Sequence, residues 1–132
     1  MSLDPNDLGP AALDFLAERH LATLTTLRAD GSLHVVPVGF SYEPEARLAR
    51  VITSGDSVKA RNAGRNGAVG ALCQVDRGRW LTLSGSMHVE TDPAAVADAV
   101  RRYAERYRPP RENPKRVVLV VEVDRLLGSL RS

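Results

Sequence analysis

Hydrophobic and polar residues alternate over residues 79–90, a pattern typical of a β-strand with one face in a core. Leu81 and Leu83 lie on the apolar side of this alternation, and Trp80 lies on the other side. Similar stretches, bounded by turn residues, predict five further strands at 21–28, 33–42, 47–54, 68–75 and 117–123. The run at 68–75 is apolar almost throughout, which indicates a central strand.

Helices are expected in three places. The first runs from Pro10 to about residue 20, and the second is a short segment at 58–66 that Gly67 ends. The third begins after Asp92, which can cap it, with Pro93 in its first turn. The apolar stripe of this third helix consists of Val96, Val100, Tyr103 and Tyr107.

Hairpin turn signals stand between consecutive strands, at Asp30-Gly31 and at Asp76-Arg77-Gly78. Because hairpins join antiparallel neighbours, six such strands with few helices indicate a mainly β domain, a small antiparallel barrel over residues 1–132. Pro37 has no amide proton, so its strand is expected at an edge or a bulge, where the backbone is open to a ligand. A barrel this small cannot enclose a large ligand, which would bind outside it and be buried by a second subunit.

Composition and charge narrow the class of protein. The chain is 43% hydrophobic but only 5% aromatic, so its core should be mainly aliphatic. Its one cysteine, Cys73, excludes an internal disulfide, is expected to be a buried small hydrophobic residue, and suits a cytoplasmic location. No apolar run reaches the ~20 residues of a membrane span.

The net charge of +2 conceals a basic segment at 101–116. This segment is either a solvated helix face with a loop or a site for an acidic small molecule. Nucleic acid is a weaker alternative, because the segment lacks interleaved aromatic residues and the chain has no helix-turn-helix pattern.

The segment 50–62 carries the clearest sign of a binding site. Asp56 or Ser57 can cap the helix that follows the turn. Lys59 lies in the first helical turn, where its charge opposes the helix dipole and a bound phosphate would account for it. Asn62 is three residues further on and shares a helix face with Lys59. The alternative is a capped surface helix with scattered positive charge.

Other chemistries lack the residues that they require. The three histidines are far apart and no pair has the spacing of metal ligands, so no metal site is predicted. The chain has no serine-hydrolase G-x-S-x-G turn and neither of the common nucleotide-binding loops. Trp80 is either a core residue or a stacking wall for a flat ligand. A phosphate site, an aromatic wall and an open strand together indicate a flat phosphorylated cofactor.

Several segments occur in the order and spacing of a known family. They are 21–24, 30–31, 37–38, 49–62 and 80–85. On these segments the chain, from about Leu8 to Leu127, resembles the split β-barrel flavin and deazaflavin oxidoreductases, which include pyridoxamine 5′-phosphate oxidases. It is most similar to their B group, which uses coenzyme F420 rather than FMN. The segments that carry this closer likeness are 28–30, 57–60, 74–76, 79–81, 106–108 and 113–114.

The resemblance implies a six-stranded antiparallel split β-barrel that forms a homodimer with two cofactor sites at the interface. It also implies hydride transfer from reduced F420 to a conjugated acceptor, with biliverdin, reduced to bilirubin, as the leading candidate. Two alternatives stay open. One is an FMN-binding oxidoreductase of the same fold, and the other is a non-catalytic protein that binds the cofactor or a tetrapyrrole.

Site residues are carried over from the family by position. The cofactor phosphate would be held by Ser57, Lys59 and Asn62, with Arg50 and Thr53 nearby. The deazaflavin ring would be lined by His34, Pro37 and Val38, and by Arg79 and Trp80 of the opposite subunit. The acceptor's propionates or the cofactor's glutamate tail would be held by Arg108, Arg111, Lys115 and Arg116. No catalytic residue is assigned.

Overall fold

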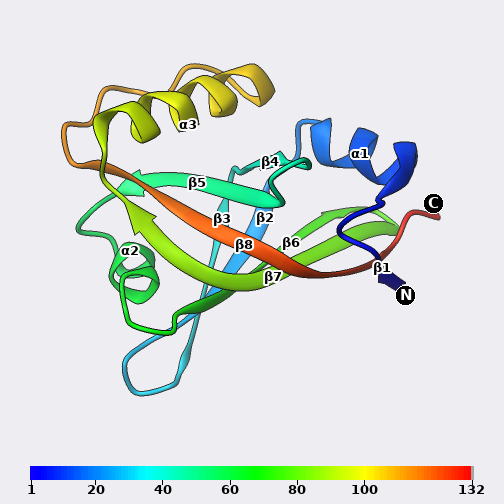
Figure 1. The fold of residues 1–132 in the computed structure, drawn as a ribbon, viewed down its shortest axis with the longest axis horizontal. Helices are drawn as coiled ribbons and strands as arrows, with labels where there is room; N and C mark the ends of the chain where they lie inside the picture. The colour runs from blue at the N-terminus through cyan, green and yellow to red at the C-terminus, as the bar shows by residue number, and fades with distance from the viewer. Residues whose placement is uncertain (132) are drawn as a thin grey trace.

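The computed structural model describes residues 1–131 and is built around one antiparallel sheet (Figure 1). Its strands are β1 (Ser2–Leu3), β2 (Ala22–Leu27), β3 (Leu33–Val38), β4 (Ser41–Glu43), β5 (Leu48–Ser54), β6 (Val69–Asp76), β7 (Arg79–Glu90) and β8 (Arg116–Ser129). The helices are α1 (Gly9–Ala17), α2 (Val58–Ala63) and α3 (Pro93–Arg106). The prediction of a mainly β, antiparallel fold with short helices is confirmed. The short strand β1 was not predicted, and the strand predicted at 33–42 is divided into β3 and β4.

The strands are hydrogen-bonded in the order β3-β2-β6-β7-β8-β5-β4, and β1 pairs with β8. Every strand pair is antiparallel. β3 is an edge strand, as Pro37 predicts. Proline has no amide proton to donate, so it fits a strand that has no neighbour on one side. β6 lies between β2 and β7, so the prediction of a central strand at 68–75 is confirmed.

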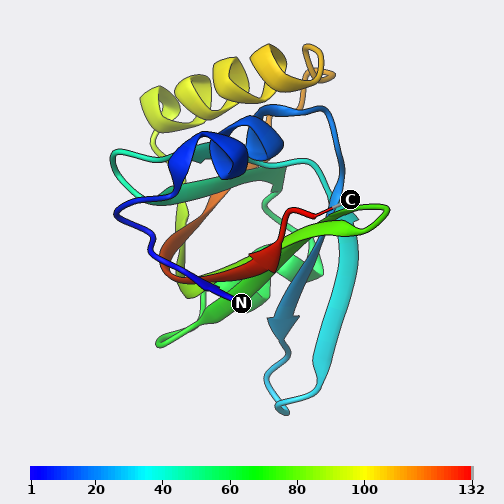
Figure 2. The same ribbon diagram turned by 90° about the vertical axis from the view of Figure 1, so that its right-hand side faces the viewer.

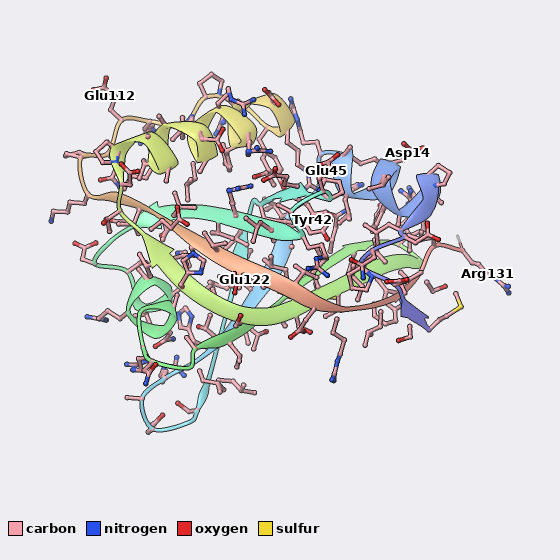
Figure 3. All side chains as sticks on the ribbon, in the orientation of Figure 1. Asp14, Tyr42, Glu45, Glu112, Glu122 and Arg131 are labelled. Carbon is pink, nitrogen blue, oxygen red and sulfur yellow. The ribbon has the colours of Figure 1, made fainter. Side chains whose placement is uncertain are left out.

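The helices lie on different sides of the strongly curved sheet. α3 and α1 run above β5 and β4, while α2 lies at the far end, beside the β2–β3 hairpin (Figure 1). Alternate residues of the strands point inward and form an aliphatic core that includes Leu72, Leu83 and Leu119, all with no exposed surface. Tyr42 of β4 packs against this core below the helices (Figure 3). A smaller apolar cluster lies under α3, where Ala99 packs against Val118 and Val120 of β8.

The opposite face of β2, β3 and β6 is apolar and uncovered. The β2–β3 hairpin projects well beyond the rest of the molecule (Figure 2). The large apolar side chains exposed on these three strands are Leu27, Leu33, Val35, Val69 and Val75. We call this surface the outer face. Cys73 lies on the same side of β6 and is partly exposed, so the prediction that it is buried was wrong.

Two predicted strands have different lengths in the structure. The predicted run 33–42 is interrupted at Gly39 and Phe40, which separate β3 from β4. The last strand extends to Ser129 rather than to residue 123, because its pairing with β7 continues to Ser129, well past the end of its pairing with β5 at Glu122. Among residues 1–131, no helix has the length and apolar character needed to cross a membrane.

Candidate functional site

A polar pocket of about 240 Å³ lies where β3 ends, between α2, α3 and the loop before β8. We call it the Lys59 pocket. Its lining residues are Pro37, Val38, Gly39, Ile52, Thr53, Lys59, Tyr103, Pro110, Asn113 and Arg116. Four segments that are far apart in the sequence therefore meet here, and five of the predicted site residues are among those that line the pocket.

The turn between β5 and α2 is held by hydroxyl groups. Ser57 caps α2, because its hydroxyl oxygen accepts a hydrogen bond of 3.2 Å from the Ala60 amide. The Thr53 hydroxyl, at the end of β5, donates to the Ser57 hydroxyl at 3.2 Å. These bonds fix the first turn of α2 against β5 and so determine where Lys59 stands.

Lys59 is a partly buried cation without a partner. Its amine has no hydrogen bond and no ion pair with any of residues 1–131, and burial lowers its pKa. Arg116, at the start of β8, brings a second cation to the same pocket, and its guanidinium donates to the Arg111 carbonyl. Two cations facing one pocket without a carboxylate in its lining create a positive potential that favours an anion.

The loop before β8 is tied to the β5–α2 turn. The Gly55 amide donates to the Lys115 carbonyl at 2.8 Å. Asn113 organises the loop itself, because its side chain accepts from the Lys115 amide at 2.9 Å and its carbonyl accepts from the Arg116 amide at 3.1 Å. Glu112, in the same loop, points away from the molecule (Figure 3). Arg116 therefore stands on a fixed loop beside Lys59.

The other wall of the pocket is mainly apolar. Pro37, Val38 and Gly39 present the end of the edge strand, where the backbone has a neighbouring strand on one side only. The Tyr103 ring lines the pocket from α3, next to Gly39. The pocket thus combines a cationic end with an apolar wall, an arrangement that suits a flat ligand with a phosphate group.

Six predicted cofactor residues do not line this pocket: Ser57, which caps α2 beside it, and Arg50, Asn62, His34, Arg79 and Trp80. Arg50 is ion-paired with Glu43, with Nη1 2.9 Å from Oε1, and this nitrogen forms no well-aligned hydrogen bond. Asn62 is 4% exposed, its amide donates to the Thr26 hydroxyl at 2.9 Å, and its oxygen accepts from Arg65. His34 is partly buried on β3, and its Nδ1 has no hydrogen-bond partner among the described residues.

Arg79 and Trp80 stand at the start of β7, opposite Asp76 and Val75 of β6, and neither lines the Lys59 pocket. The Arg79 guanidinium donates to both oxygens of Glu18, at 2.9 and 2.8 Å, and to Asp76. Hydrogen bonds from Arg79 and His20 lower the pKa of Glu18 to about 2. Glu18, His20 and Asp76 lie close enough together to hold a metal ion, but Arg79 already occupies the carboxylate oxygens that such an ion would need.

The remaining basic residues line the surface around the loop. Arg108, Arg111 and Lys115 are exposed, and only Arg116 reaches the pocket. The Lys115 amine is 3.4 Å from the Asp56 carboxylate, an exposed pair of little energetic weight. The predicted patch therefore divides into one pocket residue and three solvent-facing cations.

The sequence did not indicate that Tyr103 lines a pocket, although Pro37 and Gly39 mark this strand as one where a ligand can approach the backbone. Tyr103 belongs to the apolar stripe of a helix, and Gly39 stands inside a predicted strand. A glycine followed by an aromatic residue within a strand pattern can mark a close backbone approach, but it does not identify the partner.

A family model described as pyridoxamine 5′-phosphate oxidase matches residues 8–129. The chain belongs to the pyridoxamine 5′-phosphate oxidase family. Membership confirms the family predicted from the sequence. It also agrees with the antiparallel sheet and with a pocket at the end of an edge strand.

The relatives of this family member include enzymes and a binding protein. The F420H2-dependent biliverdin reductase of Mycobacterium tuberculosis (strain CDC 1551 / Oshkosh) is 58% identical over 122 residues, 92% of this chain and 88% of the relative. A solved F420 reductase is 24% identical with a TM-score of 0.69, covering 89% of this chain and 95% of that one. The haem storage protein HutZ of Vibrio cholerae is 18% identical with a TM-score of 0.72, covering 91% and 93%. These two structures share the fold, which by itself does not specify a function.

Proposed function

We propose that this protein is an F420H2-dependent reductase that transfers a hydride from reduced deazaflavin to biliverdin. The observation that carries the proposal is Lys59, an unpaired and partly buried cation in a pocket with an apolar wall. The support from comparison is the 58% identity to a biliverdin reductase that uses F420H2. We also expect the cytoplasmic location indicated by the single cysteine.

The residues of the Lys59 pocket fit the cofactor. Lys59 and Arg116 would hold the phosphate by charge-assisted hydrogen bonds, with Ser57 and Thr53 fixing the turn beneath it. Pro37 and Val38 would lie along the ring. We keep Asn62, Arg50 and His34 as proposed outer contacts of the cofactor. Asn62 would act through its bond to Thr26, and His34 through its unpaired Nδ1. Arg50 lies two residues before the lining residue Ile52, on the same side of β5.

A single subunit offers too little room for the whole cofactor. The pocket of about 240 Å³ is smaller than the ~300–1,000 Å³ of ordinary ligand sites. A homodimer would complete the site, with Arg79 and Trp80 contributed by the opposite subunit. We propose the outer face as the contact surface between the subunits. Val35 and Val75 on this face are 54% and 56% exposed in the single chain, and a cluster of exposed apolar side chains is typical of a protein interface.

The chemistry follows from these positions. Reduced F420, when bound, supplies the hydride. The protein would hold the ring and the acceptor together and exclude water, and this orientation is a large part of catalysis in such reactions. The lining residues include no carboxylic acid and no histidine, so we assign the proton that completes the reduction to solvent.

The decisive experiment is a titration of the purified protein with F420 and, separately, with FMN, followed by the fluorescence of its single tryptophan. We expect tighter binding of F420. Reduced F420 and biliverdin should then give bilirubin, detected by its absorbance. A clear preference for FMN would assign the chain to the FMN-binding members of the fold. Tight binding of biliverdin without turnover would support the non-catalytic alternative.

Lys59→Met tests the phosphate site directly. The loss of one charge-assisted hydrogen bond is expected to weaken F420 binding by ~1–3 kcal/mol. Arg61→Met, an exposed cation on the same helix, is the matched control and should bind F420 like the wild type. Equal affinities of the Lys59 and Arg61 variants would remove the phosphate site from the proposal.

The outer face is tested by light scattering coupled to size-exclusion chromatography. The wild type should elute as a dimer, and Val35→Lys with Val75→Lys should give a monomer that no longer binds F420 tightly. Leu13→Lys, at an exposed position on α1, is the control and should remain dimeric. A wild-type monomer that binds F420 would contradict the shared site.

The exposed arginines of the loop are proposed to bind the acceptor. Arg108→Gln with Arg111→Gln is expected to raise KM for biliverdin and leave the affinity for F420 unchanged. The reverse result would assign these residues, with Lys115, to the glutamate tail of the cofactor. If neither KM for biliverdin nor the affinity for F420 changes, these arginines bind neither the acceptor nor the cofactor tail.

A further inference from the structure

Tyr103 stands at the boundary between α3 and the Lys59 pocket. In the sequence it is one of four apolar residues that give α3 its buried stripe. In the structure its ring also lines the pocket, together with Gly39 and Pro110. A residue that only packed α3 on the sheet would not need to face this space.

The ring of Tyr103 approaches Gly39 so closely that no side chain fits there. A Cβ atom at Gly39 would lie 2.9 Å from Cε2 of Tyr103 and 3.0 Å from Cε2 of Tyr107. Gly39 does not have a positive φ, so a turn conformation is not the reason for a glycine at this position. Because Gly39 has no side chain, the Tyr103 ring can pack directly against the end of β3.

Tyr107 prevents the Tyr103 ring from moving back. The two ring centroids are 4.9 Å apart. The Tyr107 hydroxyl donates to the His20 carbonyl at 2.6 Å and accepts from the Phe40 amide at 3.3 Å. Arg106 lies over the Tyr107 ring at 5.1 Å. Tyr103 therefore rests on a neighbour that hydrogen bonds and stacking hold in place.

The Tyr103 hydroxyl makes no hydrogen bond with residues 1–131, whereas the Tyr107 hydroxyl makes several. Packing alone positions the ring, and the ring rather than its polar tip faces the pocket wall at Gly39. A fixed aromatic ring packed against the end of an edge strand discriminates among planar ligands by their shape and by how well they stack on it.

We propose that Tyr103, positioned by Gly39 and Tyr107, is a specificity-determining residue that selects the ring system of the bound cofactor. This inference rests on the proposed function, because it needs a planar phosphorylated ligand in the Lys59 pocket. It differs from the prediction made for Trp80, which does not line the Lys59 pocket of its own subunit.

The test measures the affinity of the purified full chain for F420, FMN and inorganic phosphate, the last as a competitor without a ring. Tyr103→Leu should weaken F420 binding roughly 3- to 10-fold, the scale of a lost aromatic contact, and change the ratio of F420 to FMN affinity. It should leave the competition by phosphate unchanged. Tyr103→Phe keeps the ring and should bind F420 like the wild type.

Gly39→Ala supplies an independent readout. Its methyl group should push the Tyr103 ring into the pocket and weaken F420 binding, while the same change in a Tyr103→Leu background should have a smaller effect. Additive effects would overturn the positioning role of Gly39. Thermal unfolding monitors any loss of folding in each variant.

The possible failures can be told apart. If wild-type protein binds F420 and Lys59→Met weakens it, but Tyr103→Leu changes neither the affinity nor the F420 to FMN ratio, the inference about Tyr103 is wrong and the proposed function stands. If wild-type protein binds neither F420 nor FMN, the proposed function is wrong and the inference fails with it.

Discussion

Arg106→Met is expected to destabilise the protein strongly, because this arginine joins three elements in the interior. Its guanidinium donates to the Glu18 carbonyl at 2.9 Å, to the Phe40 carbonyl at 2.6 Å and to the side-chain oxygen of Gln74. It also lies 4.7 Å from the Phe40 ring centroid. Arg106 is partly buried, and this burial lowers the pKa of its guanidinium.

The magnitude follows from the acceptors that the substitution leaves behind. Gln74 has no exposed surface, so its oxygen would lose its donor without gaining water, at a cost of ~1–3 kcal/mol. The lost contacts of the cation with aromatic rings add ~0.5–2 kcal/mol. The variant no longer has to desolvate a guanidinium, which offsets part of this sum. We therefore expect the free energy of unfolding to fall by about 2–4 kcal/mol.

Urea unfolding followed by circular dichroism measures this change. Arg101→Met is the matched control on the same helix, because Arg101 pairs only with Asp98 and Glu105 on the exposed surface and should cost less than ~0.5 kcal/mol. Adding Gln74→Met to Arg106→Met removes both partners of one bond, so the pair should cost less than the sum of the single changes. Equal stability of the Arg106 and Arg101 variants would refute the reasoning.

Two further predictions concern stability. The hydrogen bond from Arg79 lowers the pKa of Glu18 from 4.5 to about 2, so the contribution of Glu18 to stability is present above about pH 4.5 and is lost as the pH falls towards 2. Glu18→Gln should therefore be less stable than the wild type at neutral pH. Urea titrations at several pH values should show this difference shrinking over the acid range. A constant difference would contradict the assignment. Gly85→Ala should lower the free energy of unfolding by at least ~2 kcal/mol, because the new Cβ would lie 1.9 Å from the Glu122 carbonyl oxygen. Gly64→Ala is the control and should be nearly neutral in the same assay, because its Cβ would lie 3.4 Å from the nearest atom, the Ala60 carbonyl oxygen.

Local patterns predicted the elements well. The alternation over 79–90 gave both ends of β7, and the Asp92 cap with Pro93 gave the start of α3. These signals depend on residues that are neighbours in the chain, and the structure uses them as the sequence indicates. The end of β8 could not be found in the same way, because pairing with β7 and β1 extends it past its β-branched run.

The candidate site was only half visible in the sequence. Lys59 could be identified because a cation in the first turn of a helix is locally unfavourable. Its neighbours Arg116 and Tyr103 come from distant segments, so only the tertiary fold brings them together. Asn62 illustrates the limit of helix-face arguments, since two residues three positions apart still differ in direction, and on α2 this turns Asn62 towards Thr26.

The position of β8 has a consequence for how the protein reaches its fold. β8 follows all other elements in chain order, yet it lies inside the sheet. It pairs with β7 along nearly its whole length on one edge, and with β5 and then β1 on the other. Until β8 has been synthesised, β7 and β5 each have an unpaired edge, and the two halves of the sheet cannot join. Closure must therefore come late, through contacts of long sequence separation that form slowly. The unfinished chain is the stage at which this protein is most exposed to aggregation.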